Sequence, residues 1–218
     1  MAEPIVIVFT KAPEPGRVKT RLAKELGDDA AAALYRKVGG EVFARLKSLS
    51  GVRLVVAAAP EGDLTLLTSW LGPDIELWIQ SGRGLGERMA HAARDAFEEG
   101  ASKVIIVGCD GPELSAETVT DALAALEAAD AVFVPTRDGG YILVGLARYV
   151  PNLFTGMAYG HDAVLRDTTA RAEQLGLRVA KLPEQKDLDE PEDLRLFPEL
   201  AHWVEQGAFG HGKERSES

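Results

Sequence analysis

Residues 11–24 combine side chains that bind anions with a backbone that resists regular structure. They contain five cationic side chains and one anionic one, a local net charge of +4 in a chain of formal net charge −10. Pro13, Pro15 and Gly16 prevent a regular helix at the start of the segment. The apolar run before it, residues 5–9, predicts a buried strand. A stiff cationic loop at the carboxyl end of a strand is where open α/β folds hold anionic ligands.

The loop lacks both common glycine-rich phosphate motifs, G-x-x-x-x-G-K-[ST] and G-x-G-x-x-G. Side chains would therefore hold the phosphates: Arg17 and Arg21 as bidentate forks, Lys11 and Lys19 as point charges. We expect Lys19 also to act in catalysis. The alternative is a solvated basic loop without a ligand.

A second candidate is Asp110, in the sequence V-G-C-D-G-P at residues 107–112. It follows a short apolar run that predicts a buried strand. A carboxylate beside a phosphate site is well placed to bind Mg²⁺ or Mn²⁺, which take oxygen ligands and bridge to phosphate oxygens. The alternative is an aspartate that only stabilises the turn with Gly111 and Pro112. Cys109 is interpreted as a small buried side chain, since no cationic residue adjoins it in the sequence.

The acidic stretch D-L-D-E-P-E-D-L at residues 187–194 allows two interpretations. Its carboxylates suit the N-terminal turn of a helix, with Asp189 as cap and Pro191 at its first position. Asp189 could instead supply a second metal ligand beside Asp110. A glycine-rich stretch, residues 80–88, precedes a predicted helix and would allow close approach of a flat ligand; a flexible connection is the alternative. Residues 138–141, D-G-G-Y, indicate a hairpin turn.

Composition bounds the class of protein. The 218 residues are 46% hydrophobic and 27% charged, as in a soluble globular domain. The acidic balance disfavours nucleic-acid binding, and the single cysteine excludes an intrachain disulfide. No apolar run is long enough to span a bilayer, and no signal peptide is expected, so we expect a cytoplasmic protein. We expect one domain over residues 1–206 and a disordered tail over 207–218.

Apolar strand-like runs alternate with helical patterns along the chain. The alternation predicts an α/β fold, a mostly parallel sheet covered by helices on both faces. One closely spaced pair of strands interrupts it and predicts an antiparallel insertion. The expected strands are residues 5–9, 52–58, 75–79, 104–107, 131–135, 141–146 and 178–182. The expected helices are residues 28–49, capped by Asp28 and Asp29, and residues 64–71, 84–99, 115–128 and 161–175.

The motifs, in order, resemble those of the bacterial DUF2064 family over about residues 4–200. They are F-T-K-A-P-E-P-G-R-V-K-T-R-L, G-L-G-E-R-M, G-C-D-G-P-E-L, D-G-G-Y-I-L-V-G-L and D-L-D-E-P-E-D-L. The family is grouped with GT-A-fold nucleotide-diphospho-sugar transferases and is often labelled glycosyltransferase. The K-T-R-L segment at residues 19–22 also resembles 2-phospho-lactate guanylyltransferases. Where the family usually has G-x-D-C-P, this chain has Gly111 before Pro112, which loosens the turn.

The resemblance implies a GT-A-like three-layer α/β/α sandwich and assigns a role to each motif. The first loop would wrap the phosphates, and Asp110 and Asp189 would bind the metal. The glycine-rich loop would contact the base. The residues expected there are Gly84, Leu85, Gly86 and Arg88, and those expected on the acceptor side are Asp138, Gly139, Gly140 and Tyr141.

These observations predict a transferase that depends on Mg²⁺ or Mn²⁺ and uses a nucleotide donor, with a small-molecule acceptor. Glycosyl transfer from a sugar nucleotide is the first hypothesis. The alternative is a nucleotidyltransferase that releases pyrophosphate from a nucleoside triphosphate. A nucleotide-binding module without activity is the third, disfavoured by the presence of both Asp110 and Asp189. The sugar, the base, the acceptor and the oligomeric state stay open.

Overall fold

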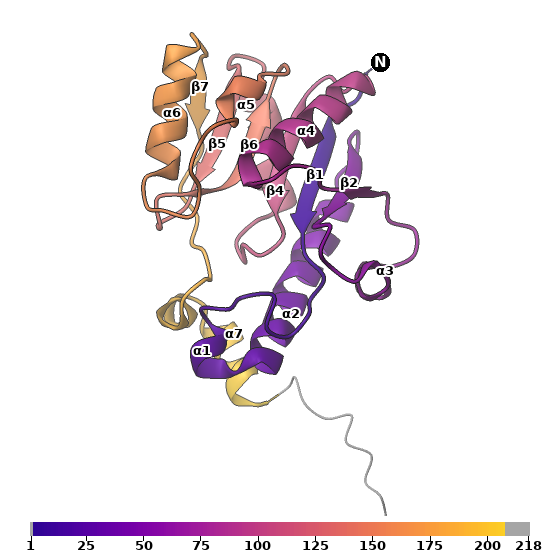
Figure 1. Ribbon diagram of the computed structural model, residues 1–218, viewed down its shortest axis with the longest axis vertical. Coiled ribbons are helices and arrows are strands. Elements are labelled where there is room, and N and C mark those ends of the chain that lie inside the picture. Colours follow the sequence, from indigo (N-terminus) through magenta and orange to yellow (C-terminus); the bar gives the residue numbers. More distant parts are fainter. Residues whose placement is uncertain (1, 208–218) are drawn as a thin grey trace, which may run out of the picture.

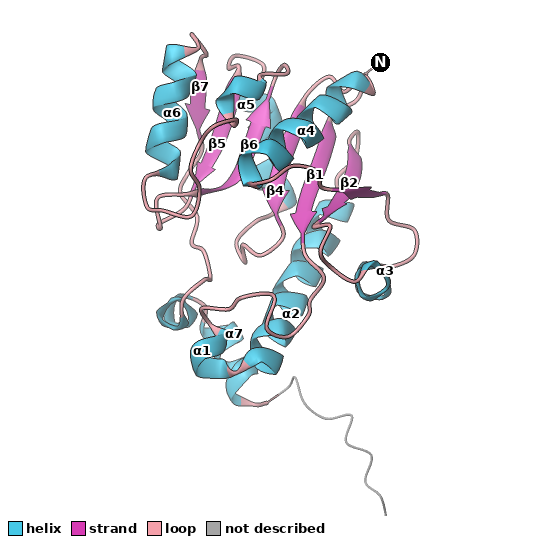
Figure 2. Cartoon of the chain, in the orientation of Figure 1, coloured by secondary structure: helices cyan, strands magenta, loops and turns pink. Residues whose placement is uncertain are grey.

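A computed structural model describes residues 2–207 and shows three layers, a central sheet with helices on both faces (Figures 1 and 2). Within these residues seven strands form one sheet, in the order β3-β2-β1-β4-β6-β5-β7. The pairings are parallel except those of β6, which runs antiparallel to both β4 and β5. The predicted α/β sandwich with an antiparallel insertion is confirmed.

The strands follow the apolar runs closely. Their bounds are β1 (Ile5–Thr10), β2 (Arg53–Ala58), β3 (Leu77–Ile79), β4 (Val104–Gly108), β5 (Ala131–Pro135), β6 (Tyr141–Leu146) and β7 (Val179–Lys181). β1 and β4 are buried at almost every position, as expected for strands covered on both faces. β3 and β7, the short edge strands, are only half-buried or exposed. Burial therefore concentrates under the centre of the sheet.

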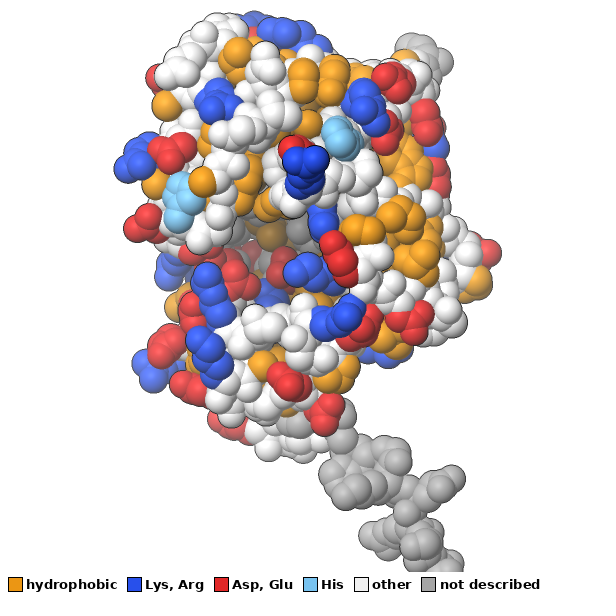
Figure 3. All heavy atoms as spheres, in the orientation of Figure 1, with side chains coloured by type: hydrophobic (Ala, Val, Ile, Leu, Met, Phe, Trp, Pro, Cys, Tyr) orange, Lys and Arg blue, Asp and Glu red, His pale blue; other side chains and the backbone are white. Residues whose placement is uncertain are grey.

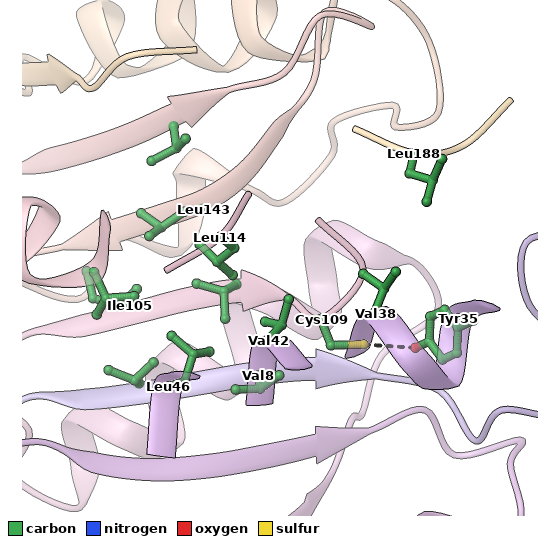
Figure 4. Close-up of a cluster of buried hydrophobic side chains, with 14 of the residues drawn as sticks. Val8, Tyr35, Val38, Val42, Leu46, Ile105, Cys109, Leu114, Leu143 and Leu188 are labelled. Carbon is green, nitrogen blue, oxygen red and sulfur yellow. Dashed lines mark hydrogen bonds between the residues drawn. The ribbon is translucent and has the colours of Figure 1, made fainter. Parts of the chain in front are cut away.

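Two hydrophobic clusters separate the layers. One lies between the sheet and α2 (Asp28–Lys47), α5 (Ala116–Ala125) and α7 (Pro198–Glu205), and contains Val8, Val42, Ile105 and Leu143 (Figure 4). The other lies between the opposite face and α4 (Leu85–Glu98) and α6 (Val164–Gln174), with Phe133 and Phe154 fully buried in it. α3 (Leu64–Leu71) covers a smaller cluster beside β2. Alternate residues of each strand thus face opposite cores.

The start of α2 differs from the prediction. Asp28 and Asp29 do not cap the helix; they lie in its first turn, where negative charge favours the helix dipole. Gly27, with φ of 83°, occupies the cap position. The pair Gly39-Gly40 does not interrupt the helix. A Cβ on Gly39 would lie 2.7 Å from the Trp70 ring, so the missing side chain lets α3 pack against α2.

Three short elements were not predicted from the sequence: α1 (Ala23–Leu26), α7 and the 3₁₀ turn η1 (Pro151–Leu153). The helical interpretation of the acidic stretch corresponds to a second 3₁₀ turn, η2 (Pro191–Leu196). Pro191 does begin η2, but the cap is Glu190 and not Asp189. Glu190 and Asp193 form a reciprocal capping box that satisfies the first backbone amides of the turn. The carboxylate of Asp189 is consequently free for another role.

The topology places the functional loops together. Within the sheet, β2, the next strand in the chain, lies on one side of β1, and β4 lies on the other side of β1. Ligands of open α/β sheets bind at such a switch point, outside the carboxyl ends of the strands. Residues 11–22 and 109–115 both start there. Among residues 2–207 no helix is long and apolar enough to cross a membrane. The predicted tail, 207–218, lies outside the described residues except for Gly207.

Candidate active site

A cavity of about 520 Å³ opens at the carboxyl ends of β1 and β4 and the amino end of the antiparallel β6. It is visible as a hollow with acidic side chains inside it and cationic ones around it (Figure 3). The first loop contributes Lys19 and Arg21 to its lining, and the loop after β4 contributes Asp110. The other walls come from the β5–β6 turn, the start of α4, and the segments 159–164 and 187–189. The sheet edge therefore brings together residues from all five motifs found in the sequence.

Lys19 is the centre of the polar part of the cavity. Its Nζ lies 2.8 Å from Oδ2 of Asp110 and 2.7 Å from Oδ1 of Asp189. The lysine side chain is only 5% exposed, whereas those of the two aspartates are 36% and 44% exposed. The two carboxylates predicted as metal ligands are thus neighbours, with an ammonium group between them.

The backbone is arranged to hold Lys19 there. Its φ of 47° is the one positive value at a non-glycine position within residues 2–207. A non-glycine residue in this region costs on the order of 1–3 kcal/mol, and such strain collects at functional sites. Val18 and Leu22 are buried in the core on either side of it. They anchor the loop so that Lys19 is directed between the carboxylates.

The charges of this group support one another. Burial disfavours the charged form of Lys19, but Asp110 and Asp189 outweigh it and hold the pKa of Lys19 above its ordinary value. Burial would raise the pKa of Asp110, but Lys19 reverses the effect and the pKa lies below its ordinary value. Lys19 is therefore a cation and Asp110 an anion at neutral pH.

A buried polar cluster links the loops after β1 and β4. The hydroxyl of Tyr35 in α2 lies 3.1 Å from Oγ1 of Thr10 and 3.0 Å from Sγ of Cys109 (Figure 4), and it accepts a hydrogen bond from the backbone amide of Lys11. Burial, followed by the charge of Asp110, raises the pKa of Cys109 to about 11. The thiol is thus protonated at neutral pH, in agreement with the predicted structural role.

A second carboxylate cluster lies beside the first. Oxygen atoms of Asp138, Asp187 and Asp189 all lie within 4.8 Å of one another. Burial, followed by the proximity of Asp138, raises the pKa of Asp187 to about 6. Three converging carboxylates form a donor set suited to a hard divalent cation, which would relieve their repulsion. These residues fit Mg²⁺ or Mn²⁺ better than the predicted pair of Asp110 and Asp189 alone, because Lys19 neutralises that pair.

The sequence singled out Asp189 but not its partners as ligands. Asp138 was expected to face the acceptor, and Asp187 was grouped with ordinary helix charges. Residues 187–189 are not helical; they form an extended connection before η2. In extended chain, side chains two residues apart point the same way. The spacing D-x-D could therefore have indicated that Asp187 and Asp189 point the same way, but the interpretation of this stretch as a helical turn did not use it.

The other predicted phosphate ligands lie apart from the cavity lining. Arg17 pairs with Glu14 at 3.3 Å and donates to the backbone carbonyl of Glu61. Arg88 pairs with the side chain of Glu61 at 2.6 Å. Lys11 is exposed near them. Only Lys19 and Arg21 of the predicted cationic set line the cavity, and a phosphate role of the other three stays a prediction.

The residues predicted in the glycine-rich loop and in the hairpin also lie partly in the cavity lining and partly outside it. Leu85 lines the cavity, whereas Gly84 and Gly86 do not. A Cβ on Gly86 would lie 2.4 Å from the carbonyl oxygen of Phe154, so this glycine serves packing.

In the hairpin, Asp138, Gly140 and Tyr141 line the cavity. Gly139 does not, since it packs against the backbone of Asp162. Tyr159, His161 and Asp162, which the sequence did not indicate as site residues, complete that wall.

The family model described as "Uncharacterized protein conserved in bacteria (DUF2064)" matches residues 42–161, more than half of the chain. The chain belongs to the DUF2064 family. A solved structure from Desulfovibrio desulfuricans G20, provisionally described as a nucleotide-diphospho-sugar transferase, is 33% identical. It matches with a TM-score of 0.82 over 94% of this chain and 98% of that one. No curated protein sequence matches the chain.

More distant solved structures share the fold of this DUF2064 member. A 4-diphosphocytidyl-2C-methyl-D-erythritol synthase is 15% identical, with a TM-score of 0.60 over 92% of this chain and 99% of that one. A cytidylyltransferase from Leptospira borgpetersenii is 12% identical, with a TM-score of 0.56 over the full length of both chains. At these identities the likeness establishes the nucleotide-diphospho-sugar transferase fold, in agreement with the GT-A-like prediction.

Arg17 and Arg21 allow a direct test of which residues of the first loop bind phosphate. Arg21 lines the cavity and pairs with Glu190 at its rim. We expect Arg21→Ala to weaken binding of a nucleoside triphosphate by about 1.5 kcal/mol, or roughly tenfold, because a charged hydrogen bond is lost. Arg17→Ala should change binding less than twofold, since Arg17 lies outside the cavity lining, where it pairs with Glu14 and donates to the backbone carbonyl of Glu61. Calorimetric titration compares them; equal losses would extend the phosphate site beyond the cavity.

Proposed function

We propose that this protein is a metal-dependent transferase that takes a group from a nucleotide donor. The observation that carries the proposal is Lys19, buried between Asp110 and Asp189 at the switch point of the sheet. A charged lysine held by strained backbone costs stability, and a solely structural role would not require one there. The family membership and the fold of the relatives support a nucleotide ligand.

The side chains suggest how the donor would be held. The phosphates would contact Lys19 and Arg21, and both cations would offset charge that develops on the leaving group. Asp138, Asp187 and Asp189 would hold a Mg²⁺ or Mn²⁺ ion. When bound, such an ion polarises phosphate oxygens and fixes their orientation. Asp110 would keep Lys19 charged and directed at the donor.

Of the two reactions, the cavity favours nucleotidyl transfer. A transferred sugar presents several hydroxyl groups, whereas much of the cavity lining is apolar, including Phe9, Met89 and Val144. In nucleotidyl transfer an acceptor oxygen attacks the α-phosphorus, the bond to the β-phosphate oxygen breaks, and pyrophosphate leaves. Glycosyl transfer, the first hypothesis from the sequence, is supported by polar groups of the lining, among them His161 and Asp162.

The products of the reaction decide between them. The purified protein is incubated with Mg²⁺ and each of a panel of nucleoside triphosphates and sugar nucleotides, together with pooled phosphorylated and hydroxylated acceptors. Chromatography then resolves the nucleotides. Pyrophosphate release supports nucleotidyl transfer, and a nucleoside diphosphate from a sugar nucleotide supports glycosyl transfer. Binding without any product would favour the nucleotide-binding module without activity, and the failure of every donor to bind would refute the proposal.

The metal site gives a separate prediction. We expect Asp187→Asn to weaken Mn²⁺ binding at least tenfold, because it removes one of three converging carboxylates. Electron paramagnetic resonance titration of free Mn²⁺ measures the change. Asp121→Asn, at an exposed position of α5, is the matched control and should bind like the wild type. If Asp110→Asn loses affinity while Asp187→Asn does not, the ion lies between Asp110 and Asp189 instead.

A further inference from the structure

The cavity has two chemically different ends. At one end lie the charged groups around Lys19. The other end, called here the apolar chamber, is lined by the side chains of Phe9, Leu85, Met89, Tyr141, Val144 and Tyr159. Five of these six, all but Leu85, belong to or pack against a single hydrophobic cluster, the one between the sheet and α4 and α6. The chamber is therefore a continuous apolar surface that opens into the site.

The packing of the residues around the apolar chamber leaves space inside it. Gly86 lies where a Cβ would come within 2.7 Å of the Tyr159 ring, so the missing side chain leaves room for that ring. Tyr141 rests edge-on against Phe133, with ring centroids 5.1 Å apart. Leu85, at the mouth, is 47% exposed although it is a large apolar side chain. Well-placed apolar groups that remain in contact with solvent indicate a ligand that would cover them.

Two polar groups lie within this apolar surface. The hydroxyls of Tyr141 and Tyr159 are buried and lie close to each other, and that of Tyr141 also lies close to Thr168, although none of these contacts has normal hydrogen-bond geometry. Because both hydroxyl oxygens are buried beneath the surface, they add almost no polar area to the chamber wall. The chamber therefore suits a mainly apolar group with few polar atoms. It does not suit a ligand with hydroxyls on all sides.

The chamber is less suited to the base of the donor nucleotide. Leu85 of the glycine-rich loop expected to contact the base does line the chamber, but none of the loop's glycines, which would let a flat base approach closely, lines the cavity. The chamber walls instead include β6 and residue 159, on the acceptor side of the switch point.

We propose that the acceptor of this transferase is amphipathic, with a polar reacting group beside Lys19 and the acidic cluster and an alkyl or aromatic portion in the apolar chamber. This inference rests on the proposed function, since it assigns the second substrate of the same site. It defines the acceptor by chemical class: a small molecule with one polar end, and not a free sugar.

Neutral amphiphiles test the chamber without competing for the phosphate site. Ethyl, butyl and hexyl β-D-glucosides, with glucose as reference, are titrated calorimetrically into the full-length chain below their micelle concentrations. Each methylene that enters the chamber should raise affinity up to about fourfold, so hexyl glucoside should bind roughly tenfold tighter than butyl glucoside. Affinities that do not change with chain length would overturn the proposal.

Two leucines supply matched variants. Leu85 and Leu64 are both exposed first residues of helices, but only Leu85 lines the cavity. Leu85→Ser should lower the affinity for hexyl glucoside several-fold and leave that for ethyl glucoside unchanged. Leu64→Ser should change neither. The same loss in both variants would mean that the glucosides bind elsewhere on the surface and would refute the assignment.

Competition with nucleotide separates this inference from the function on which it rests. Saturating CTP or UTP with Mg²⁺ should leave the affinity for hexyl glucoside within twofold of its value without nucleotide. Competitive displacement would show that the chamber holds the base and would overturn the proposal. A protein that binds no nucleotide would refute the transferase, but the chain-length series would still decide whether the chamber takes an apolar ligand.

Discussion

Replacing Lys19 with methionine is expected to reduce nucleotide binding at least 100-fold and to lower the free energy of unfolding by about 2–3 kcal/mol. Two charged hydrogen bonds to Asp110 and Asp189 disappear, and the two carboxylates are left without their shared cation. The stability loss is placed below the usual value for a broken buried pair because both aspartates are more than one-third exposed. Urea unfolding and calorimetric titration measure the two effects.

The Lys19 variant has an informative control and a rescue. Lys37 forms an ion pair with Glu41 along the surface of α2, so Lys37→Met should cost less than about 1 kcal/mol and leave binding unchanged. In Lys19→Met, millimolar Mg²⁺ should restore part of the lost stability, since a divalent ion can take the place of the ammonium between the carboxylates. Wild-type stability and wild-type nucleotide affinity together would show that Lys19 is incidental to the site.

Gly139→Ala is expected to destabilise the protein by about 3 kcal/mol or more and to disrupt the wall of the cavity. A Cβ at this position would lie 1.8 Å from the backbone oxygen of Asp162, and the backbone φ of 83° is itself unfavourable for alanine. The carbonyl of Gly139 also accepts the amide of Leu165, which ties the hairpin to the start of α6. Thermal and urea unfolding report the loss.

A second glycine, Gly176, allows the cost of the steric clash at residue 139 to be separated from the cost of its backbone conformation. Gly176 has a φ of 68° with nothing near its missing side chain, so Gly176→Ala should cost only about 1 kcal/mol. The difference between the two variants measures the close approach of residues 139 and 162. Similar losses would mean that the hairpin shifts without cost and that this wall of the cavity is adaptable.

The periodicity of the sequence predicted nearly all of the sheet. Buried strands such as β4 are continuous apolar runs, and long helices such as α2 repeat their apolar residues every three to four positions. Helix ends were less accurate. The sequence pointed to Asp28 as a cap because of its residue type, whereas Gly27 takes that position through its backbone conformation. Local residue preference does not determine which of two neighbours adopts the cap geometry.

The sequence predicted which loops form the site but not how their side chains are arranged in space. The cationic loop and Asp110 were identified because each follows a strand, and the carboxyl ends of parallel strands lie at the same edge of the sheet. The position of Lys19 between two aspartates depends on the fold as a whole, as does the convergence of Asp138 with Asp187. Arg17 and Arg88 have the right charge, but their partners come from residue 61, in the connection after β2, which no local pattern indicates.

The hydrogen bond from Lys19 to Asp189 joins residues 170 positions apart. During synthesis Lys19 leaves the ribosome 170 residues before its second carboxylate partner, Asp189. The β1 loop must therefore remain without that partner until residue 189 has emerged. A nascent chain that ends before residue 187 contains all seven strands, but it lacks Asp189 and leaves Asp110 as the one carboxylate paired with Lys19. The charge balance of the site is therefore completed only after the sheet-forming residues have been made.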